Sequence, residues 1–192
     1  MKLEKIQKEL EKTLSPKRFR HSAGVADMAR HLAHLYGASE EKACLAGWIH
    51  DAAKEMTLSE MQHVVKKAHL TFDDAEHMLK SRALLHGPAG SVLAKTAFGI
   101  EDEEIQGAIY YHTTGRVGMT LLEKIVFLAD YIEPNRDFPG VEELRSLAEK
   151  DLDQAVLAAY DSTISHLIDK GAYIYGLTFL GRNDMVEKLG TR

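Results

Sequence analysis

Apolar residues recur at the spacing of an α-helix along nearly the whole chain, and no alternating pattern typical of a strand competes with it. Ser15 and Pro16 form an N-cap followed by a first-turn proline, so we expect a helix that begins there and ends at Gly37. Its inner stripe includes Val25 and Leu32. The pattern therefore predicts an all-α, single-domain bundle and disfavours every fold that needs a sheet.

Capping residues and chain breaks divide the rest of the chain into further expected helices. Ser39 caps a helix that reaches about Ala53, and Thr57 caps the next one. Residues 71–82 are expected to form a short polar helix or a loop, and Gly87-Pro88 is expected to break the chain. The remaining helices are expected at about 89–98, 103–111, 121–132 and 141–170, with a short one near Asp184.

Length and composition indicate an ordinary globular protein. The 192 residues fit one domain, residues 1–192, with 45% hydrophobic and 28% charged residues. The net charge of −5 argues against a large basic surface for nucleic acid. Cys44 is the only cysteine, which excludes an internal disulfide and a cysteine-based zinc site. Because no apolar run approaches the roughly 20 residues needed to cross a bilayer, we expect a cytoplasmic protein without a membrane partner.

Single ionisable groups stand at the polar ends of several apolar runs. The pair His50-Asp51 ends the run Cys44-Leu-Ala-Gly-Trp-Ile, and His86, His112 and Asp130 end three other apolar segments. A carboxylate among apolar neighbours needs a partner of opposite charge, and a metal cation is an economical one. We interpret these segments together as one metal-centred hydrolytic site.

The candidate metal ligands are His21, His50, Asp51 and Asp130. Consecutive helical residues differ by about 100° in direction, so His50 and Asp51 can both reach one ion beside a helix end. Two imidazoles and two carboxylates suit iron, manganese and other first-row divalent ions, and four ligands leave positions open for water and substrate. The simpler alternatives are a core histidine for His21 and a helix cap or surface charge for Asp51.

His86 and His112 each precede a local break in the chain, and two roles stay open for them: ligands of a second ion, or donors to a bound phosphate. Lys54 follows His50 by one turn and suits a phosphate contact, although a solvated lysine fits almost as well. The other histidines lie in polar surroundings or lack a matching partner, and we assign them to the surface: His31, His34, His63, His69, His77 and His166.

The order His21, His50-Asp51, Asp130 resembles the HD-domain metal-dependent phosphohydrolases. His86 and His112 match the longer form of that pattern. The segments 85–88, 111–115 and 129–136 are similar to those of the YqeK-type HD hydrolases of bacteria, and the resemblance extends from about Ser15 to Asn183. It implies a helical bundle of the HD-domain type, with a metal-binding core at about 16–135 and helices in 141–192 that complete it.

The resemblance also implies an activity. YqeK-type enzymes are symmetrical bis(5'-nucleosyl)-tetraphosphatases, which cleave diadenosine tetraphosphate into two molecules of ADP with a bound iron ion. We therefore expect one divalent ion, iron with manganese as the alternative, and we leave a second ion and a homodimer open. One departure is the pair Tyr175-Gly176, where relatives are expected to have His-Pro. This departure puts details of nucleotide recognition in doubt and leaves the metal ligands unaffected.

Within that expected reaction, Asp51 ligates the ion and orients the attacking water, while Lys54, His86 and His112 act on the phosphates. The expected substrate contacts are Arg18, Lys54, His86, His112, Glu133, Asn135, Arg136, Tyr173 and Arg182. The ligands alone do not separate this activity from a nucleotide 5'-phosphatase or a phosphodiesterase of the same family. A non-catalytic nucleotide-binding metal protein and a helical interaction module with structural histidines are the alternatives outside it.

Overall fold

The computed structural model describes residues 2–190, which form eleven helices and no strand. The predicted all-α fold is therefore confirmed, while Met1, Thr191 and Arg192 of the predicted domain lie outside the described residues. The helices are α1 (Leu3–Thr13), α2 (Pro16–Tyr36), α3 (Glu40–Ile49), α4 (Leu58–Lys67), α5 (Ala75–Lys80), α6 (Arg82–Thr96), α7 (Glu103–Tyr111), α8 (Leu121–Ile132), α9 (Val141–Ala148), α10 (Leu152–Asp169) and α11 (Gly176–Leu189).

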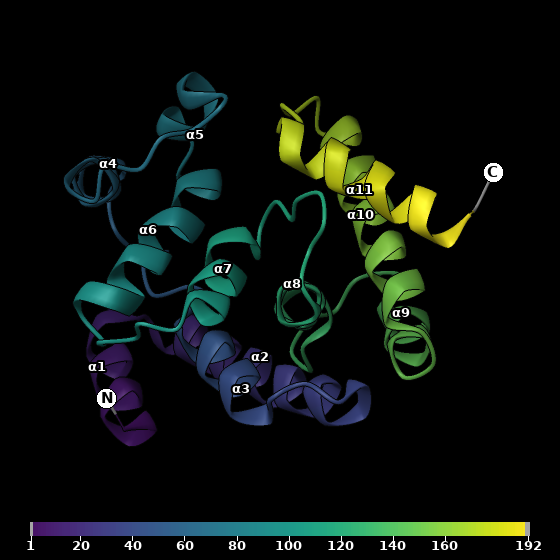
Figure 1. The fold of residues 1–192 in the computed structure, drawn as a ribbon, viewed down its shortest axis with the longest axis horizontal. Coiled ribbons are helices and arrows are strands. Elements are labelled where there is room, and N and C mark those ends of the chain that lie inside the picture. Colours follow the sequence, from purple (N-terminus) through teal and green to yellow (C-terminus); the bar gives the residue numbers. More distant parts are fainter. Residues whose placement is uncertain (1, 191–192) are drawn as a thin grey trace.

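Helix α8 lies between two groups of helices in Figure 1: α4, α5 and α6 on one side, and α9, α10 and α11 on the other. It contacts α2, α3 and α7 as well as α10. Helix α7 in turn contacts α3 and α6. The helices α2, α3, α6, α7 and α8 thus form a continuous set of neighbours, with α2 and α3 below α7 and α8 in Figure 1.

The local sequence explains where α2 begins and ends. The Ser15 side chain accepts a hydrogen bond from the backbone N–H of Arg18, and Pro16 occupies the first helical position. At the other end, Gly37 adopts a φ of 71°, a left-handed conformation that glycine reaches without steric cost. Both predicted boundaries of this helix are confirmed.

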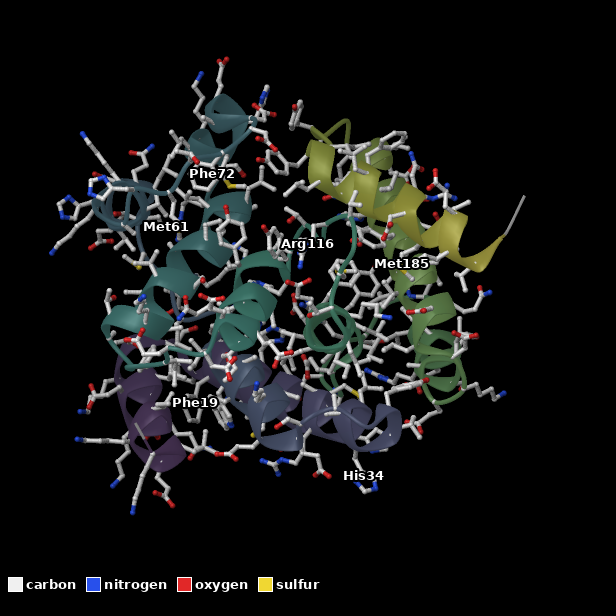
Figure 2. All side chains as sticks on the ribbon, in the orientation of Figure 1. Phe19, His34, Met61, Phe72, Arg116 and Met185 are labelled. Atoms are coloured by element: carbon white, nitrogen blue, oxygen red, sulfur yellow. The ribbon has the colours of Figure 1, made fainter. Side chains whose placement is uncertain are left out.

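Buried apolar side chains form two clusters. The main cluster draws on most helices and includes Tyr160, whereas the smaller one joins α4, α5 and α6 and also contains Tyr175. Met61 of the smaller cluster and Met185 of the main one lie on opposite sides of the molecule (Figure 2). Because Leu157 and Tyr160 are both buried, this part of the apolar face of α10 belongs to the core.

Two expected boundaries near the middle of the chain are wrong. Helix α3 ends at Ile49 instead of about Ala53, because the chain passes there into successive turns. Helix α6 begins at Arg82 and continues through Gly87-Pro88, where a break was expected. Residues 85–91 are all buried, so their tertiary packing outweighs the backbone hydrogen bond that Pro88 cannot donate.

The single long helix expected at about 141–170 is wrong as well, because α9 and α10 are separate helices. The side chain of Asp151 accepts a hydrogen bond from the backbone N–H of Gln154 and begins a new helix. This spacing of an N-cap and a glutamine is itself a start signal. Helix α11 is also longer than the short helix expected near Asp184. Among residues 2–190, no helix is both long enough and apolar enough to cross a membrane.

Replacing Gly47 by alanine should destabilise the fold, because a Cβ atom there would lie 2.6 Å from Cα of Ala26. Two helix backbones would have to separate, and overpacking of this kind costs about 1–3 kcal/mol. Urea unfolding followed by circular dichroism measures the loss. The matched control is Gly176→Ala, because a Cβ at Gly176 meets nothing within 4 Å. Equal stability of the two variants would contradict the close contact of α2 and α3.

Candidate metal centre

Side chains from α2, α3, α6, α7 and α8 converge on one buried position. His21 lies in the first half of α2, and His50 is the C-cap residue of α3 with Asp51 next to it. His86 lies in the first half of α6, and His112 is the C-cap residue of α7. The sixth group, Asp130, lies in the last turn of α8. Buried among them are His21, His50, Asp51, His86 and His112, while Asp130 is partly exposed.

The first half of the cluster contains His21, His50, Asp130 and one oxygen of Asp51. Nε2 of His21 lies 3.0 Å from Oδ1 of Asp130 and 3.3 Å from Nε2 of His50. Oδ2 of Asp51 lies 3.5 Å from Nε2 of His50 and 3.7 Å from Nε2 of His21. The ligand atoms of His21, His50 and Asp130 are close enough together to bind a single ion.

The second half surrounds the other carboxylate oxygen of Asp51. Its Oδ1 lies 3.2 Å from Nε2 of His86 and 3.7 Å from Nε2 of His112. The two imidazole Nε2 atoms are 2.9 Å apart. The ligand atoms of His50, Asp51 and His112 form a further group that can hold a metal. Asp51 therefore connects both halves of the cluster.

Backbone hydrogen bonds fix the orientation of three of the histidine rings. Nδ1 of His50, His112 and His86 lies 2.6, 2.7 and 3.3 Å, respectively, from a carbonyl oxygen three or four residues earlier. A carbonyl oxygen only accepts, so Nδ1 carries a proton in each ring, and in the neutral imidazole Nε2 keeps its lone pair. In each ring that lone pair is directed toward Asp51 and the neighbouring imidazoles.

The environment also shifts the pKa values of these groups. Burial lowers the pKa of His86 to about 4, against the opposing effect of Asp51. Burial likewise lowers the pKa of His112. For Asp51, burial alone would raise the pKa, but the facing imidazoles of His50, His112 and His86 hold it well below its usual range. Burial opposes the charged form of His50 as well, but the charges of Asp51 and Asp130 raise its pKa. His86 and His112 are therefore neutral imidazoles beside an ionised carboxylate, which is the protonation state that a metal ligand requires.

The cluster is a good fit for a cation. Oδ1 of Asp51 is buried and has no hydrogen-bond partner, although an unsatisfied buried carboxylate oxygen is costly. The imidazole lone pairs around it are acceptors too, so they do not satisfy it. A divalent ion satisfies all of these acceptors at once, and a mixed set of nitrogen and oxygen ligands suits iron or manganese.

Comparison with known proteins agrees with this geometry. Residues 18–135 match the family model described as "HD domain". The chain belongs to the HD domain family.

Individual relatives of this HD domain extend the similarity beyond the family model. A Halalkalibacterium halodurans protein is 42% identical over 90% of this chain and 91% of its own length, and a Bacillus subtilis protein is 41% identical over 91% and 92%. Both are named "Bis(5'-nucleosyl)-tetraphosphatase, symmetrical". The prediction of a metal-dependent hydrolase of the HD family is confirmed by these relatives.

A solved structure of an HD protein has the same fold. It is described as a predicted HD superfamily hydrolase involved in NAD metabolism from Clostridium acetobutylicum. It is 42% identical in sequence, has a TM-score of 0.93 and covers 98% of both chains. The predicted HD-type bundle is confirmed along nearly the whole chain.

Several of the predicted substrate contacts surround the predicted metal ligands of this HD domain. Arg18 donates a hydrogen bond to Oδ2 of Asp51, and Nζ of Lys54 lies 2.9 Å from Nε2 of His86. Arg136 donates to Oδ1 of Asp130 at 2.7 Å. These cationic groups lie at the cluster itself, where a polyphosphate would need them.

The carboxylate of Glu133 is buried beside His21, and the amide of Asn135 donates to it. Two other predicted contacts pair with groups outside the cluster. The hydroxyl of Tyr173 donates to Asp74 at 2.7 Å, and Arg182 donates to Asp161 at 2.8 Å. Substrate roles for all of these residues stay predictions.

The six histidines assigned to the surface are all exposed, and that prediction is confirmed. His34, for example, projects outward from α2 (Figure 2). One polar neighbour of the cluster was missed, namely Thr113. Its hydroxyl oxygen lies 3.1 Å from Nε2 of His86 and 3.0 Å from Nε2 of His112. Its place directly after His112 was the available signal.

Mn²⁺ should raise the thermal stability of the metal-free protein, because an ion that binds only the folded state stabilises it. At a free concentration of about 100 times Kd the gain is about 2.7 kcal/mol. Asp51→Asn should lose most of this gain, since Asp51 serves both halves of the cluster. Differential scanning calorimetry with and without Mn²⁺ measures it. The control is His34→Asn on the exposed side of α2, and no Mn²⁺ effect on the unaltered protein would contradict the metal centre.

Proposed function

We propose that this HD-domain protein is a symmetrical bis(5'-nucleosyl)-tetraphosphatase that hydrolyses diadenosine tetraphosphate to two molecules of ADP. The observation that carries the chemistry is the buried acceptor cluster around Asp51, which has the composition of a divalent metal site. The substrate rests on the relatives named for this activity, which are 41% and 42% identical over nine-tenths of the chain.

The proposed ligands of the first ion are His21, His50, Asp51 and Asp130, with iron as the native metal and manganese as the alternative. His86 and His112, together with Oδ1 of Asp51, are proposed ligands of a second ion. Their ring orientation supports this role over phosphate donation, because both Nδ1 protons are already used by backbone carbonyls. A divalent cation in this cluster supplies a Lewis acid that favours ionisation of water and stabilises negative charge on phosphoryl oxygens.

Side chains of the protein orient the water and bind the phosphates in the proposed reaction. Asp51 orients the attacking water toward one of the two inner phosphorus atoms of the tetraphosphate. Arg18 and Lys54 lie next to Asp51 and His86 and donate hydrogen bonds to the phosphate oxygens. The bond between that phosphorus and the central bridging oxygen breaks, and the bridging oxygen leaves with the second ADP.

Arg136 is proposed to recognise the ADP half that stays bound. Its guanidinium group already holds Asp130 through the carboxylate and the backbone carbonyl, and it is partly exposed. One face of the guanidinium group is therefore available to a phosphate without breaking these bonds. Such a contact would set the distance between the bound nucleotide and the ligand cluster, and this distance decides which phosphorus is attacked.

Product analysis tests the proposed cut. The purified protein with Fe²⁺ or Mn²⁺ should convert diadenosine tetraphosphate into ADP alone, measured by ion-exchange chromatography. In ¹⁸O-labelled water, one of the two ADP molecules should carry the label on its terminal phosphate. Equal amounts of ATP and AMP would contradict symmetric cleavage. Faster hydrolysis of a nucleoside monophosphate or of a cyclic nucleotide would indicate a different activity within the family.

Lys54→Met should lower kcat/KM for diadenosine tetraphosphate by about 100-fold, the usual size of the effect when one charge-stabilising donor is removed. Nζ of Lys54 lies against His86, while its removal leaves all six proposed ligands in place. Steady-state kinetics at saturating Mn²⁺ measures the change. Lys67→Met is the control, because Lys67 is exposed at the end of α4. Unchanged kinetics of Lys54→Met would remove this lysine from the reaction.

A further inference from the structure

One histidine of the cluster is anchored differently from the others. His50, His86 and His112 each donate from Nδ1 to a carbonyl oxygen of their own helix, three or four residues earlier. Nδ1 of His21 instead lies 3.0 Å from Oε1 of Glu133, a residue 112 positions away in the sequence. Among these four rings, only that of His21 has its Nδ1 held by a carboxylate, and only that of His21 is held by a residue outside its own helix.

The positions of the rings in their helices explain the difference between His21 and two of the others, His50 and His112. His50 and His112 are C-cap residues, and carbonyl groups in the last turn of a helix have no N–H partner of their own. His21 lies in the first half of the 21-residue helix α2, where the carbonyl groups already accept backbone hydrogen bonds. A free carbonyl group of this kind is not available to the His21 ring, and Glu133 from outside the helix supplies the acceptor.

We infer that Glu133 is a positioning residue of the metal centre, whose carboxylate holds the His21 ring with Nε2 turned toward the other ligands. The inference rests on the proposed metal centre and is independent of the proposed substrate. A carboxylate behind a ligating histidine fixes the ring orientation and makes the ligand nitrogen more basic, and its loss weakens metal binding by about 10- to 100-fold.

The carboxylate of Glu133 is itself fixed. Its Oε2 accepts hydrogen bonds from the backbone N–H and the side-chain amide of Asn135, each at 2.7 Å. Arg145 donates to the backbone carbonyls of Ile132 and Glu133, both at 2.8 Å, and so holds the turn that follows α8. Both carboxylate oxygens are thus engaged, and the side chain is only 2% exposed. This role differs from the direct substrate contact that the sequence predicted for Glu133.

The backbone of α2 leaves space for this group. A Cβ atom at Gly24 would lie 2.4 Å from Oε2 of Glu133 and 3.0 Å from the amide nitrogen of Asn135. Gly24 follows His21 by three residues and lies on the same face of α2. Because Gly24 has no side chain, the carboxylate can lie against α2 within hydrogen-bond distance of Nδ1 of His21.

The same turn supports a second ligand. Arg136 donates to Oδ1 and to the backbone carbonyl of Asp130 at 2.7 and 2.9 Å. Two residues of the short segment after α8 thus each fix one proposed ligand. Glu133 holds His21, and Arg136 holds Asp130. Nε2 of His21 and Oδ1 of Asp130 are 3.0 Å apart. Rotation of either side chain would therefore separate these two proposed ligand atoms.

Substitution of two buried glutamates, Glu133 and Glu123, tests the inference. Glu133→Gln should bind Mn²⁺ about 10- to 100-fold more weakly than the unaltered protein in isothermal titration calorimetry. The control is Glu123→Gln on α8, because Glu123 is also buried but pairs with Arg116 and caps its own helix. Glu123→Gln should lower the melting temperature and leave the Mn²⁺ affinity of the folded protein unchanged. Unaltered affinity in Glu133→Gln, or an equal loss in both variants, would overturn the inference.

A measurement on the unaltered protein covers the case in which Glu133→Gln does not fold. In ¹⁵N-histidine NMR spectra of the metal-free protein, His21 should carry its proton on Nδ1, the atom that faces Glu133. A proton on Nε2 with none on Nδ1 would overturn the inference. Absence of Mn²⁺ binding by the unaltered protein would contradict the metal centre itself, whereas binding retained in Glu133→Gln contradicts only the role of Glu133.

Discussion

A buried excess of hydrogen-bond acceptors dominates the structure of this protein. Oxygen atoms of Asp51 and Asp130 face imidazole nitrogens, and Oδ1 of Asp51 has no hydrogen-bond partner. Each unsatisfied buried acceptor costs about 1–3 kcal/mol or more, so such a cluster persists only if a cation satisfies it or the rest of the fold holds it together. The metal centre and the fold are therefore coupled.

Two helix ends and the turn after α8 orient three of the imidazole rings. His50 and His112 terminate α3 and α7, where free carbonyl groups lock the imidazoles at no cost to the helix. His21 lies inside a helix and depends on Glu133 from the turn after α8. In both arrangements the ring presents Nε2 to a carboxylate oxygen of Asp51.

The apolar run that ends in His50-Asp51 was sufficient to predict a metal site, because a buried histidine and carboxylate need compensation wherever they lie. The helix pattern likewise predicted α2, α7 and α8, whose start and stop signals are local. The break expected at Pro88 was wrong, because local propensity favours a break there and burial of the surrounding residues overrides it. The separation of α9 and α10 had a local signal in Asp151 that the apolar spacing obscured.

The sequence by itself determined the helical class, the residues able to bind a metal and the resemblance to a family of hydrolases, because these depend on residue type and local spacing. Only the tertiary structure decided that Asp51 joins two groups of ligands and that Thr113 lies at the second one. It alone decided that Glu133 contacts His21. Such contacts join residues up to 112 positions apart, and no local pattern encodes which distant side chain fills the space beside a given glycine.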